Sequence, residues 1–581
     1  FKMIYNLFGM LTKNLGKIIT VLKRKTHFIF IFFLWFLTAI SQLIFLRLDR
    51  LPPLGDGIRF ILRGMELFMI NSQIGLWEFI KEVFKVVDSG PPFVDITYFL
   101  YYKLFGFSTE MELIVNSLYL GAGIIGVYGI GKYFFNRNTG VLAVLIFTTL
   151  PGVLIFNNLG YREFHIMCIV ALTLYFLFYS DNFANGKFSI LFGASLGLLF
   201  MIKYQGLIFV AVPIFKTLAD VIYKRFFLKK ESKGLFFNIT ISLTLFFIIG
   251  LFWYVVNWRS FFNIMKNRIN NLPSGDFIFT IKNLFFYSKG LFDGMLYRVY
   301  SFLFIGIGLC NMFICIRKKN IINHSKNILI IYFYFMIPFL FFTFLGLKEF
   351  SHMLPLLPFI SVVIAGGYNL IINKYFKKGF FIIIIFMHII PIYISPILKI
   401  FCRTNGCFAA DTMSPIDKFI YRFTYEDPIK RPYSINIEEW DSKIKGILQF
   451  IKNDYLIGST SSNDSNNKPR VLLLANSLVF RFFQLEYYNN LEGKPVNLIS
   501  IIFPIGPEPK DPEKHIFGNN YDYLLMETAE DFIHGQEDKI LKDTLAFIRD
   551  NIDRVNKKYI LIGEFVLPGE STKALVYKRI N

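Results

Sequence analysis

Long apolar runs follow one another along the first 400 residues of the chain and then stop. Many are about 20 residues long, the length that a helix needs to cross a hydrocarbon core of roughly 30 Å. The pattern therefore predicts a polytopic α-helical membrane protein. Eleven spans are expected, near residues 27–46, 113–134, 139–157, 163–180, 188–202, 204–223, 235–256, 296–315, 327–345, 353–372 and 380–399.

Two longer stretches between these runs have an amphipathic pattern. Residues 47–112 contain IRFILRGMELF, GLWEFIKEVFKVV and FVDITYFLYYKLFGF, and residues 257–294 contain WRSFFNIMKNRI and FTIKNLFFYSKGLF. Helices with one apolar and one charged face lie in the plane of a membrane surface. Singly, each would seal the rim of the helix bundle. Together, they indicate a roof over a cavity at the outer interface.

After residue 400 the pattern becomes that of a globular domain. Residues 401–440 are rich in Pro and charge and are interpreted as a linker. An amphipathic helix, DSKIKGILQFIKND, then precedes the strand patterns PRVLLLAN, VNLISIIF and YDYLLM, the helix KILKDTLAFIRDNID, and the strand pair KYILIGEFVL and KALVYKRI. This alternation predicts an extracytoplasmic α/β domain with a partly parallel sheet over residues 441–581, following a membrane domain over residues 1–400.

The composition excludes an ordinary soluble protein, because 54% of the 581 residues are hydrophobic, 71 are Phe, and the mean hydropathy is +0.49. The net charge of +21 would by itself fit a nucleic-acid partner. Much of the Lys and Arg, however, lies in short loops between apolar runs, where it reports topology instead. We therefore expect membrane lipids as partners and no nucleic acid.

Loops rich in Lys and Arg alternate with loops that are poor in them, and this alternation predicts the orientation. Cytoplasmic loops carry the excess of positive charge, which places the basic N-terminus on the cytoplasmic side of a plasma (inner) membrane. The first apolar run is too long for a signal peptide and lacks a small-residue cleavage site, so we expect it to remain as a helix. The turns NNLGYREF and LGLKEFSH and the C-terminal domain then lie outside.

The stretch LPPLGDGIRFILRG holds the first candidate for chemistry, Asp56. A carboxylate in front of an amphipathic helix is suited to an N-cap, because it accepts backbone N–H bonds. The same carboxylate, on the outer side and close in sequence to Arg59 and Arg63, is also a candidate general base. Asp88 and Asp95 flank the rigid turn SGPPFVD and are the next acids in line.

Further charges are expected at the outer ends of the spans. Arg162 and Glu163 in LGYREFHI form either an internal ion pair or a contact to phosphate or sugar. Lys203 lies between two long apolar runs, where a charge is costly unless it reaches the interface or has a function. Lys348 and His352 in LGLKEFSHMLPLLPF meet the outer interface, where a lone His is more often structural than catalytic.

The sparse cysteines offer no metal site. Cys402 and Cys407 in FCRTNGCF lie on the predicted outer side, where either a disulfide or free thiols would be compatible with the compartment. A metal held by this pair would need further ligands nearby, and none is evident.

The order of these features resembles that of the GT-C glycosyltransferases. A first helix, an outer acid and a surface segment ending in PPF precede NSLYLGAGIIGVYGIGKYFFNRNTGVLAVLIFTTLPGVLIFNNLGYRE. GASLGLLFMIKYQGLIFVAVP resembles that superfamily's helix pair with a Lys at the junction, and LKEFSHMLPLLPFISVVIAGG resembles its basic residue followed by a Leu-Pro-rich span. Residues 27–400 are most similar to the protein O-mannosyltransferase and aminoarabinose transferase type.

The resemblance implies a transferase that moves a sugar from a polyprenyl-phosphate donor to a lipid, glycan or protein acceptor on the outer face. Asp56 matches the family's first-loop acid, its expected general base, although Gly57 follows where mannosyltransferase members carry a second acid. One carboxylate suffices for a single displacement with inversion. Arg162, Lys203 and Lys348 are the expected partners of the phosphate leaving group.

The remaining expected substrate contacts are Arg59 and Arg63 behind these cations, together with Asp95, Glu163 and His352. A phosphate leaving group with several basic partners does not require a divalent ion. We therefore expect no metal and no other cofactor.

A lipid-linked sugar transporter or flippase without transferase chemistry is the alternative. Such a protein is expected to carry functional charges near mid-membrane and inverted repeats. Here the charges gather at the outer face and no such repeat is visible in the sequence. The pattern therefore favours the transferase.

Overall fold

The computed structural model describes most of the helical region and most of the strands of the tail. The described residues are 26–43, 56–71, 73–85, 90–106, 111–227, 234–270, 281–296, 298–317, 323–344, 350–371, 374–389, 437–458, 468–474, 485–486, 489, 496–500, 513, 516–517, 521–527, 537–567 and 573–580.

The chain folds as two compact units. The membrane unit comprises Phe1–Arg47, Leu67–Phe401 and Pro415–Pro428, and the tail unit comprises Leu48–Glu66, Cys402–Ser414 and Ile429–Asn581.

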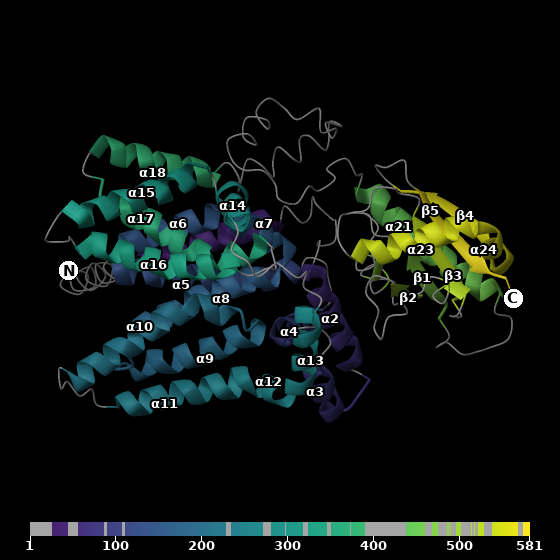
Figure 1. Ribbon diagram of the computed structural model, residues 1–581, viewed down its shortest axis with the longest axis horizontal. Helices are drawn as coiled ribbons and strands as arrows, with labels where there is room; N and C mark the ends of the chain where they lie inside the picture. Colours follow the sequence, from purple (N-terminus) through teal and green to yellow (C-terminus); the bar gives the residue numbers. More distant parts are fainter. Residues whose placement is uncertain are drawn as a thin grey trace, which may run out of the picture. The chain divides into compact units, whose positions relative to one another are not determined.

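The membrane unit is built almost entirely from helices, as the apolar runs predict. Figure 1 shows the long ones running side by side. The helical segments of this body, long and short, are Thr26–Leu43, α5 (Met111–Phe134), α6 (Arg137–Thr149), α7 (Pro151–Leu159), α8 (Arg162–Tyr179), α9 (Gly186–Ile202), α10 (Gly206–Phe226), α11 (Leu235–Phe246), η1 (Phe247–Leu251), α12 (Phe252–Val256), α15 (Arg298–Arg317), α16 (Asn323–Phe344), η3 (Phe350–Leu356), α17 (Leu357–Tyr368) and α18 (Lys374–Ile389).

All eleven predicted spans overlap helices of the membrane unit. Among the described residues, seven helices are long and apolar enough to cross a bilayer, or eight if the bent pair Arg137–Thr149 and Pro151–Asn157 counts as one span. Gly186–Ile202 and Arg298–Ile314 are apolar but shorter. The number of crossings, eleven in the prediction, stays a prediction.

Helices α5 and α8 pack closely because α5 carries small residues on the facing side. A Cβ on Gly126 would lie 2.3 Å from the carbonyl carbon of Ala171. Small residues at such crossings let two backbones approach each other, which favours packing where no water drives helices together. The same device joins α9 to α11, where a Cβ on Gly193 would lie 2.3 Å from the carbonyl oxygen of Ser242.

The break between α6 and α7 determines where α8 begins. The two helices are bent by 59° around Leu150, whose backbone is extended, and Pro151 opens α7 where its missing N–H costs nothing. Helix α7 ends at Gly160, which has a φ of 61°, a conformation that glycine adopts at little cost. The chain then enters α8 directly at Arg162.

The predicted amphipathic segments are helical. They form α2 (Asp56–Asn71), α3 (Leu76–Phe84), α4 (Phe93–Phe105), α13 (Trp258–Asn270) and α14 (Ile281–Lys289). Figure 1 shows α3, α4 and α13 gathered at one end of the long helices. An aromatic cluster holds them there: Trp253 and Tyr254 of α12 pack with Phe84, Phe93 and Phe261.

The tail unit contains a five-stranded sheet between helices. Its elements are α21 (Ile437–Gly458), β1 (Arg470–Leu474), β2 (Asn497–Ser500), β3 (Tyr523–Glu527), α23 (Glu537–Asp550), α24 (Ile552–Lys558), β4 (Tyr559–Val566) and β5 (Lys573–Arg579). The strand order is β2-β1-β3-β5-β4, with β2, β1 and β3 parallel and β5 antiparallel to both neighbours. This arrangement confirms the predicted α/β domain with a partly parallel sheet.

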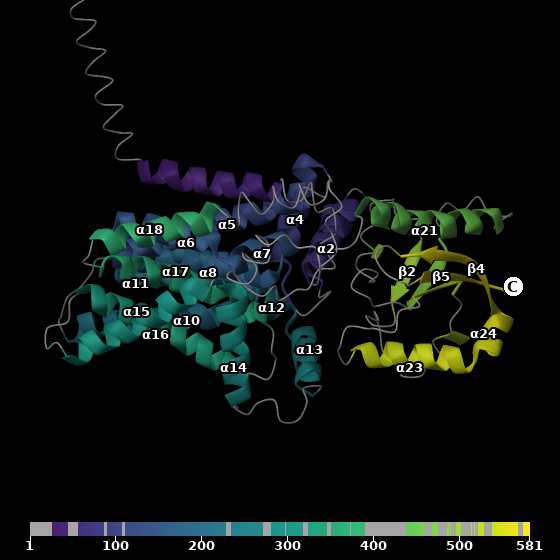
Figure 2. The same cartoon turned by 90° about the horizontal axis from the view of Figure 1, so that it is seen from above.

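Alternate residues of the tail strands serve the two faces of the sheet. Leu524 of β3 packs in the core formed with α23 and α24, while the hydroxyl of its neighbour Tyr523 donates to Asp454 of α21 at 2.6 Å. Figure 2 shows the sheet with α21 on one side and α23 on the other. The predicted linker residues up to 436, with Cys402 and Cys407, lie outside the described part of the chain.

Replacing Gly126 by Ala should destabilise the membrane unit, because its new methyl group would force α5 and α8 apart. We expect a clear fall in the thermal unfolding temperature of the purified protein in detergent. The matched control is Gly306→Ala in α15, where a Cβ meets nothing within 4 Å. That change should be neutral or slightly stabilising, since Ala is the better helix former by about 0.5–1 kcal/mol. Equal effects of the two variants would show that the α5–α8 contact is not tight.

Acid should weaken the tail through Asp454. Burial raises the pKa of this carboxyl, but hydrogen bonds from Lys578 and Tyr523 outweigh burial and leave the pKa below its ordinary value of 3.8. A lowered pKa stabilises the fold above pH 3.8, and this contribution is lost as the pH falls through the folded-state pKa. Asp454→Asn should therefore lower the free energy of unfolding of the tail at pH 7. The expected loss is less than about 1 kcal/mol, because the pair is partly exposed. Near pH 2 the loss should be much smaller.

The stability of the tail is measured in the full-length protein as the urea concentration at the midpoint of protease cleavage. Thermolysin is used at neutral pH and pepsin in acid. Glu564→Gln is the control, because its pair with Lys573 is more exposed and should matter less. A loss that is the same at both pH values would contradict the assigned role of the Asp454 carboxylate.

Candidate active site

The first turn of α8 carries two opposite charges into the interior of the membrane unit. Arg162 and Glu163 are 7% and 3% exposed, although both would prefer water. Helix α8 starts here because Gly160 ends α7 and Tyr161 has the extended backbone of an N-cap. A carboxylate in the first turn also interacts favourably with the helix dipole. The local sequence therefore positions both charged side chains in the buried first turn of α8.

Lys203 supplies the partner of Glu163. It follows the last residue of α9 with an extended backbone, and its N–H still bonds to the Leu199 carbonyl oxygen before α10 begins at Gly206. Its Nζ lies 2.6 Å from Glu163 Oε1, and the two side chains are 20% and 5% exposed. A buried carboxylate with no cation beside it would be strongly disfavoured. The junction Lys predicted as costly is therefore used as one half of a buried ion pair.

His352 joins the pair from the short helix η3. The side chain is 6% exposed, and its ring stacks on Phe342 with centroids 5.5 Å apart. It lies close enough to Glu163 and Lys203 to interact electrostatically with both. The structure thus brings together three groups that are 40 to 189 residues apart in sequence.

Arg162 extends toward the loop before α4. A Cβ on Gly90 would lie 2.0 Å from Arg162 Nη1, so a side chain at this position would displace the guanidinium. Tyr254 of α12 lies within electrostatic range of the same guanidinium, and its hydroxyl donates to the Phe200 carbonyl oxygen at 3.1 Å. The charged cluster of Arg162, Glu163, Lys203 and His352 is therefore bordered by the loop that leads into the surface helices.

A buried polar network lies one turn further along α8, and sequence reasoning missed it. His165 Nε2 lies 2.9 Å from Asn116 Oδ1, which also accepts from the Tyr98 hydroxyl at 3.1 Å. The amide of Asn116 donates to the Asn157 carbonyl oxygen at 2.8 Å. The signal was present in the sequence, since Asn116 and His165 are polar residues inside apolar runs. The network links α4, α5, α7 and α8, and its His165 is two residues after Glu163 of the charged cluster.

The charged cluster is suited to binding an anion. Arg162 and Lys203 bring two positive charges and Glu163 one negative charge, so these three groups carry one positive charge in excess. Burial strengthens their interaction with a charge that develops nearby, because little water screens it. The guanidinium can also form paired hydrogen bonds to phosphate oxygens.

Part of the chain matches a known family. Residues 89–253 match the sequence profile of the family described as dolichyl-phosphate-mannose-protein mannosyltransferase. The matched part contains the loop before α4, Arg162, Glu163 and Lys203. No curated protein sequence matches the chain.

Among solved structures, ArnT from Cupriavidus metallidurans bound to undecaprenyl phosphate is similar over 93% of this chain and 97% of its own, with a TM-score of 0.50 and 11% identity. At this identity the likeness is one of fold, and the chain has the fold of ArnT. The oligosaccharyltransferase of Archaeoglobus fulgidus, tethered to an acceptor peptide, aligns with 97% of this chain and 75% of its own at a TM-score of 0.48 and 12% identity.

The match of residues 89–253 and the likeness of fold to ArnT agree with the predicted resemblance to membrane glycosyltransferases. The architecture is confirmed as well: a multi-span helical body and a C-terminal region with a small sheet. The alternative of a transporter without chemistry has no support from the family match.

Four of the predicted site residues, Arg162, Glu163, Lys203 and His352, meet in the charged cluster. Asp95 lies in the first turn of α4, half-buried, and within electrostatic range of Tyr119. Lys348 and Asp88 lie outside the described residues.

The residues predicted around the first-loop acid belong to the tail unit. Asp56 is the first residue of α2, and its side chain is outside the described part of the structure. Arg59 is half-buried. Arg63 is 9% exposed and pairs with Glu66 at 2.8 Å. The roles of these residues in the chemistry stay predictions.

No group of three or more His, Cys, Asp or Glu side chains in the described residues is placed to hold a metal ion. The metal-independent reaction stays a prediction.

Removing one member of the buried pair should cost more than removing one of an exposed pair. Lys203→Met leaves Glu163 charged and buried, for which we expect a loss of about 3–5 kcal/mol. Glu163→Gln should cost less, because Lys203 is 20% exposed and can reach water. The double variant Glu163→Gln/Lys203→Met should recover much of the stability. Thermal unfolding of each purified variant in detergent measures this.

The matched control is Lys216→Met in α10. Lys216 pairs with Asp220 at 2.6 Å, but both side chains are nearly half exposed, so its loss should change stability by less than about 1 kcal/mol. If Lys203→Met were no worse than Lys216→Met, burial would not govern the pair.

Proposed function

We propose that this protein transfers a sugar from a polyprenyl-phosphate donor to an acceptor on the outer face of the plasma membrane. The observation that carries this proposal is the buried charged cluster of Arg162, Glu163, Lys203 and His352 within a GT-C fold. A soluble nucleotide-sugar donor would not need such charges among membrane helices. A phosphate held on an apolar carrier would need them there.

In the proposed reaction, an acceptor hydroxyl oxygen attacks the anomeric carbon from the face opposite the phosphate. The bond between that carbon and the phosphate oxygen breaks, and polyprenyl phosphate leaves with the electron pair. The configuration at the carbon is inverted. Asp56 takes the proton of the acceptor hydroxyl, the role implied by its match to the family's first-loop acid.

The charged cluster would act on the leaving phosphate. Negative charge on the phosphate grows as the bond breaks, and Arg162 and Lys203 stabilise it in surroundings with little water. Glu163 fixes the direction of the Lys203 ammonium through their 2.6 Å contact. The predicted contributions of Lys348, Arg59, Arg63, Asp95 and His352 belong to the same proposal, as does independence of metal ions.

The solved relative with bound undecaprenyl phosphate supports a lipid phosphate as the carrier class. A lipid, a glycan or a protein accepts the sugar. The alternation of basic loops predicts a cytoplasmic N-terminus and an outer tail, and the proposal puts the acceptor on the side of the tail.

Asp56→Asn should lower sugar transfer by about 10²–10⁴-fold, because the amide cannot take the proton. The measurement is turnover of a panel of radiolabelled polyprenyl-phosphate monosaccharides by the purified protein in lipid, with and without chelator. Binding of the lipid donor should remain, since the change leaves the charged cluster intact.

Asp220→Asn is the matched control, an acid-to-amide change in α10 outside the proposed chemistry, and should keep wild-type turnover. Inhibition by chelator would overturn metal independence alone. Full activity of Asp56→Asn would move the base to Asp88 or Asp95. Movement of the lipid without turnover of any donor would favour the flippase.

A further inference from the structure

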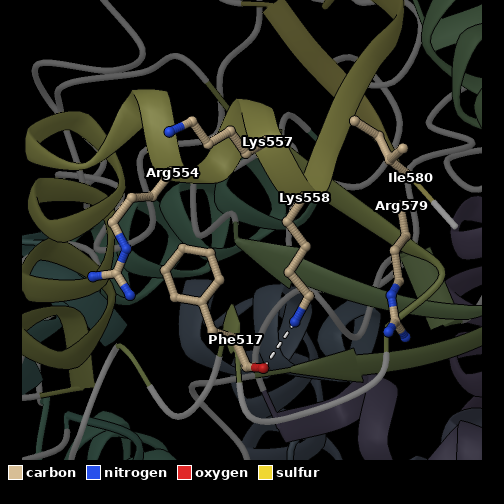
Figure 3. Close-up of a pocket in the computed structure, with 6 residues that line it drawn as sticks. All are labelled: Phe517, Arg554, Lys557, Lys558, Arg579 and Ile580. Atoms are coloured by element: carbon tan, nitrogen blue, oxygen red, sulfur yellow. Dashed lines mark hydrogen bonds between the residues drawn. The ribbon is translucent and has the colours of Figure 1, made fainter.

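The tail unit contains a cavity of about 380 Å³ at the junction of α24 and β5. Its lining is strongly basic and, among the residues that form it, without a carboxylate: Phe517, Arg554, Lys557, Lys558, Arg579 and Ile580. Figure 3 shows Arg554 and Lys558 on the two sides of the Phe517 ring, with Arg579 beyond Lys558. All of them belong to the tail unit, so the cavity is a feature of that unit by itself.

Two of the cations lie side by side, and among the described residues neither has a counter-charge. Lys558 and Arg579 extend alongside each other in Figure 3, one from the end of α24 and the other from the end of β5. Lys558 Nζ donates to the Phe517 carbonyl oxygen at 2.8 Å, which is a neutral partner. Burial and the neighbouring Arg579 lower the pKa of Lys558. Within the described residues, neither side chain forms an ion pair.

Arg554 lies on the opposite side of the cavity and makes two contacts there. Its guanidinium lies over the Phe517 ring, 4.9 Å from the centroid, and its Nη2 lies 2.8 Å from Glu513 Oε1. This pair is half exposed, and it neutralises one of the four positive charges. Three positive charges remain on Lys557, Lys558 and Arg579.

Helix stability explains only part of this concentration of charge. Lys557 and Lys558 occupy the last turn of α24, where cations interact favourably with the helix dipole. Arg579 lies on β5 and gains nothing from that dipole. Its closeness to Lys558 adds repulsion between like charges, which a bound anion would relieve.

We propose that this cavity binds the phosphate group of an anionic ligand. Lys558 and Arg579, which form no ion pair within the described residues, supply two adjacent positive charges, which suit a phosphate better than a single carboxylate. The planar Arg579 guanidinium fits paired phosphate oxygens. The volume exceeds that of a phosphate alone and leaves room for an ester group against the Phe517 ring. The ligand is therefore a phosphate ester or a pyrophosphate, free or as a lipid headgroup.

The reactivity of Lys558 provides the readout. A lysine with a lowered pKa is acylated readily, and a bound anion should slow this reaction by covering the amine and raising its pKa. The full-length protein is labelled with a limiting acylating reagent, and modification of each lysine is quantified by mass spectrometry. The probes are inorganic phosphate and pyrophosphate in detergent, compared with sodium chloride at equal ionic strength. Lys573, which is paired with Glu564, serves as the internal reference.

A second arm separates the two sources of phosphate. The protein is reconstituted in nanodiscs of phosphatidylcholine alone or mixed with phosphatidylglycerol, and labelling of Lys558 is compared. Protection by soluble phosphates supports a free ligand, and protection by phosphatidylglycerol supports a lipid headgroup. Either result supports the proposal, whatever the outcome for sugar transfer.

Arg579→Gln should weaken protection by about tenfold or more, since it removes a charged hydrogen-bond donor to the anion. Arg549→Gln is the matched control, an exposed Arg of α23 outside the cavity lining, and should leave protection unchanged. Protection no greater than that by sodium chloride, or equal losses in both variants, would overturn the proposal.

Discussion

The buried contact between Glu163 and Lys203 is the constraint on which the proposed site depends. Each charge would be costly alone inside a helical membrane protein, and together they stabilise one arrangement of α8 against the α9–α10 junction. His352 and Arg162 lie around this pair. The cost of separating the charges therefore keeps the whole cluster in one geometry, which is what stabilisation of a leaving phosphate requires.

Local backbone geometry places each member of that pair at the end of a helix. The bend at Leu150 and the positive φ of Gly160 make α8 begin at Arg162, and the end of α9 at Ile202 leaves Lys203 in the turn. Close packing of α5 on α8 through Gly126 then holds α8, which carries Arg162 and Glu163, against α5. The polar network of Asn116 and His165 connects α5 and α8 two residues after Glu163.

Charge is distributed unevenly over the tail unit. On the α21 side, Asp454 gathers Lys578 and Tyr523 into a compensated group. At the junction of α24 and β5, Lys558 and Arg579 lie together with no such partner among the described residues. A fold selected only for stability would separate these two cations, so their proximity points to a ligand.

The sequence by itself determined the membrane class, the positions of the helices, the amphipathic segments and the α/β character of the tail. These properties follow from hydropathy and its period, which act over a few turns of chain. It also singled out Arg162, Glu163, Lys203 and His352, because charges at the ends of apolar runs are conspicuous. Only the tertiary structure decided that these four meet, and that Asn116 and His165 form a network, since contacts between distant residues depend on how helices pack. The basic cavity of the tail arises in the same way, from a helix and a strand whose charges look unremarkable until the fold brings them together.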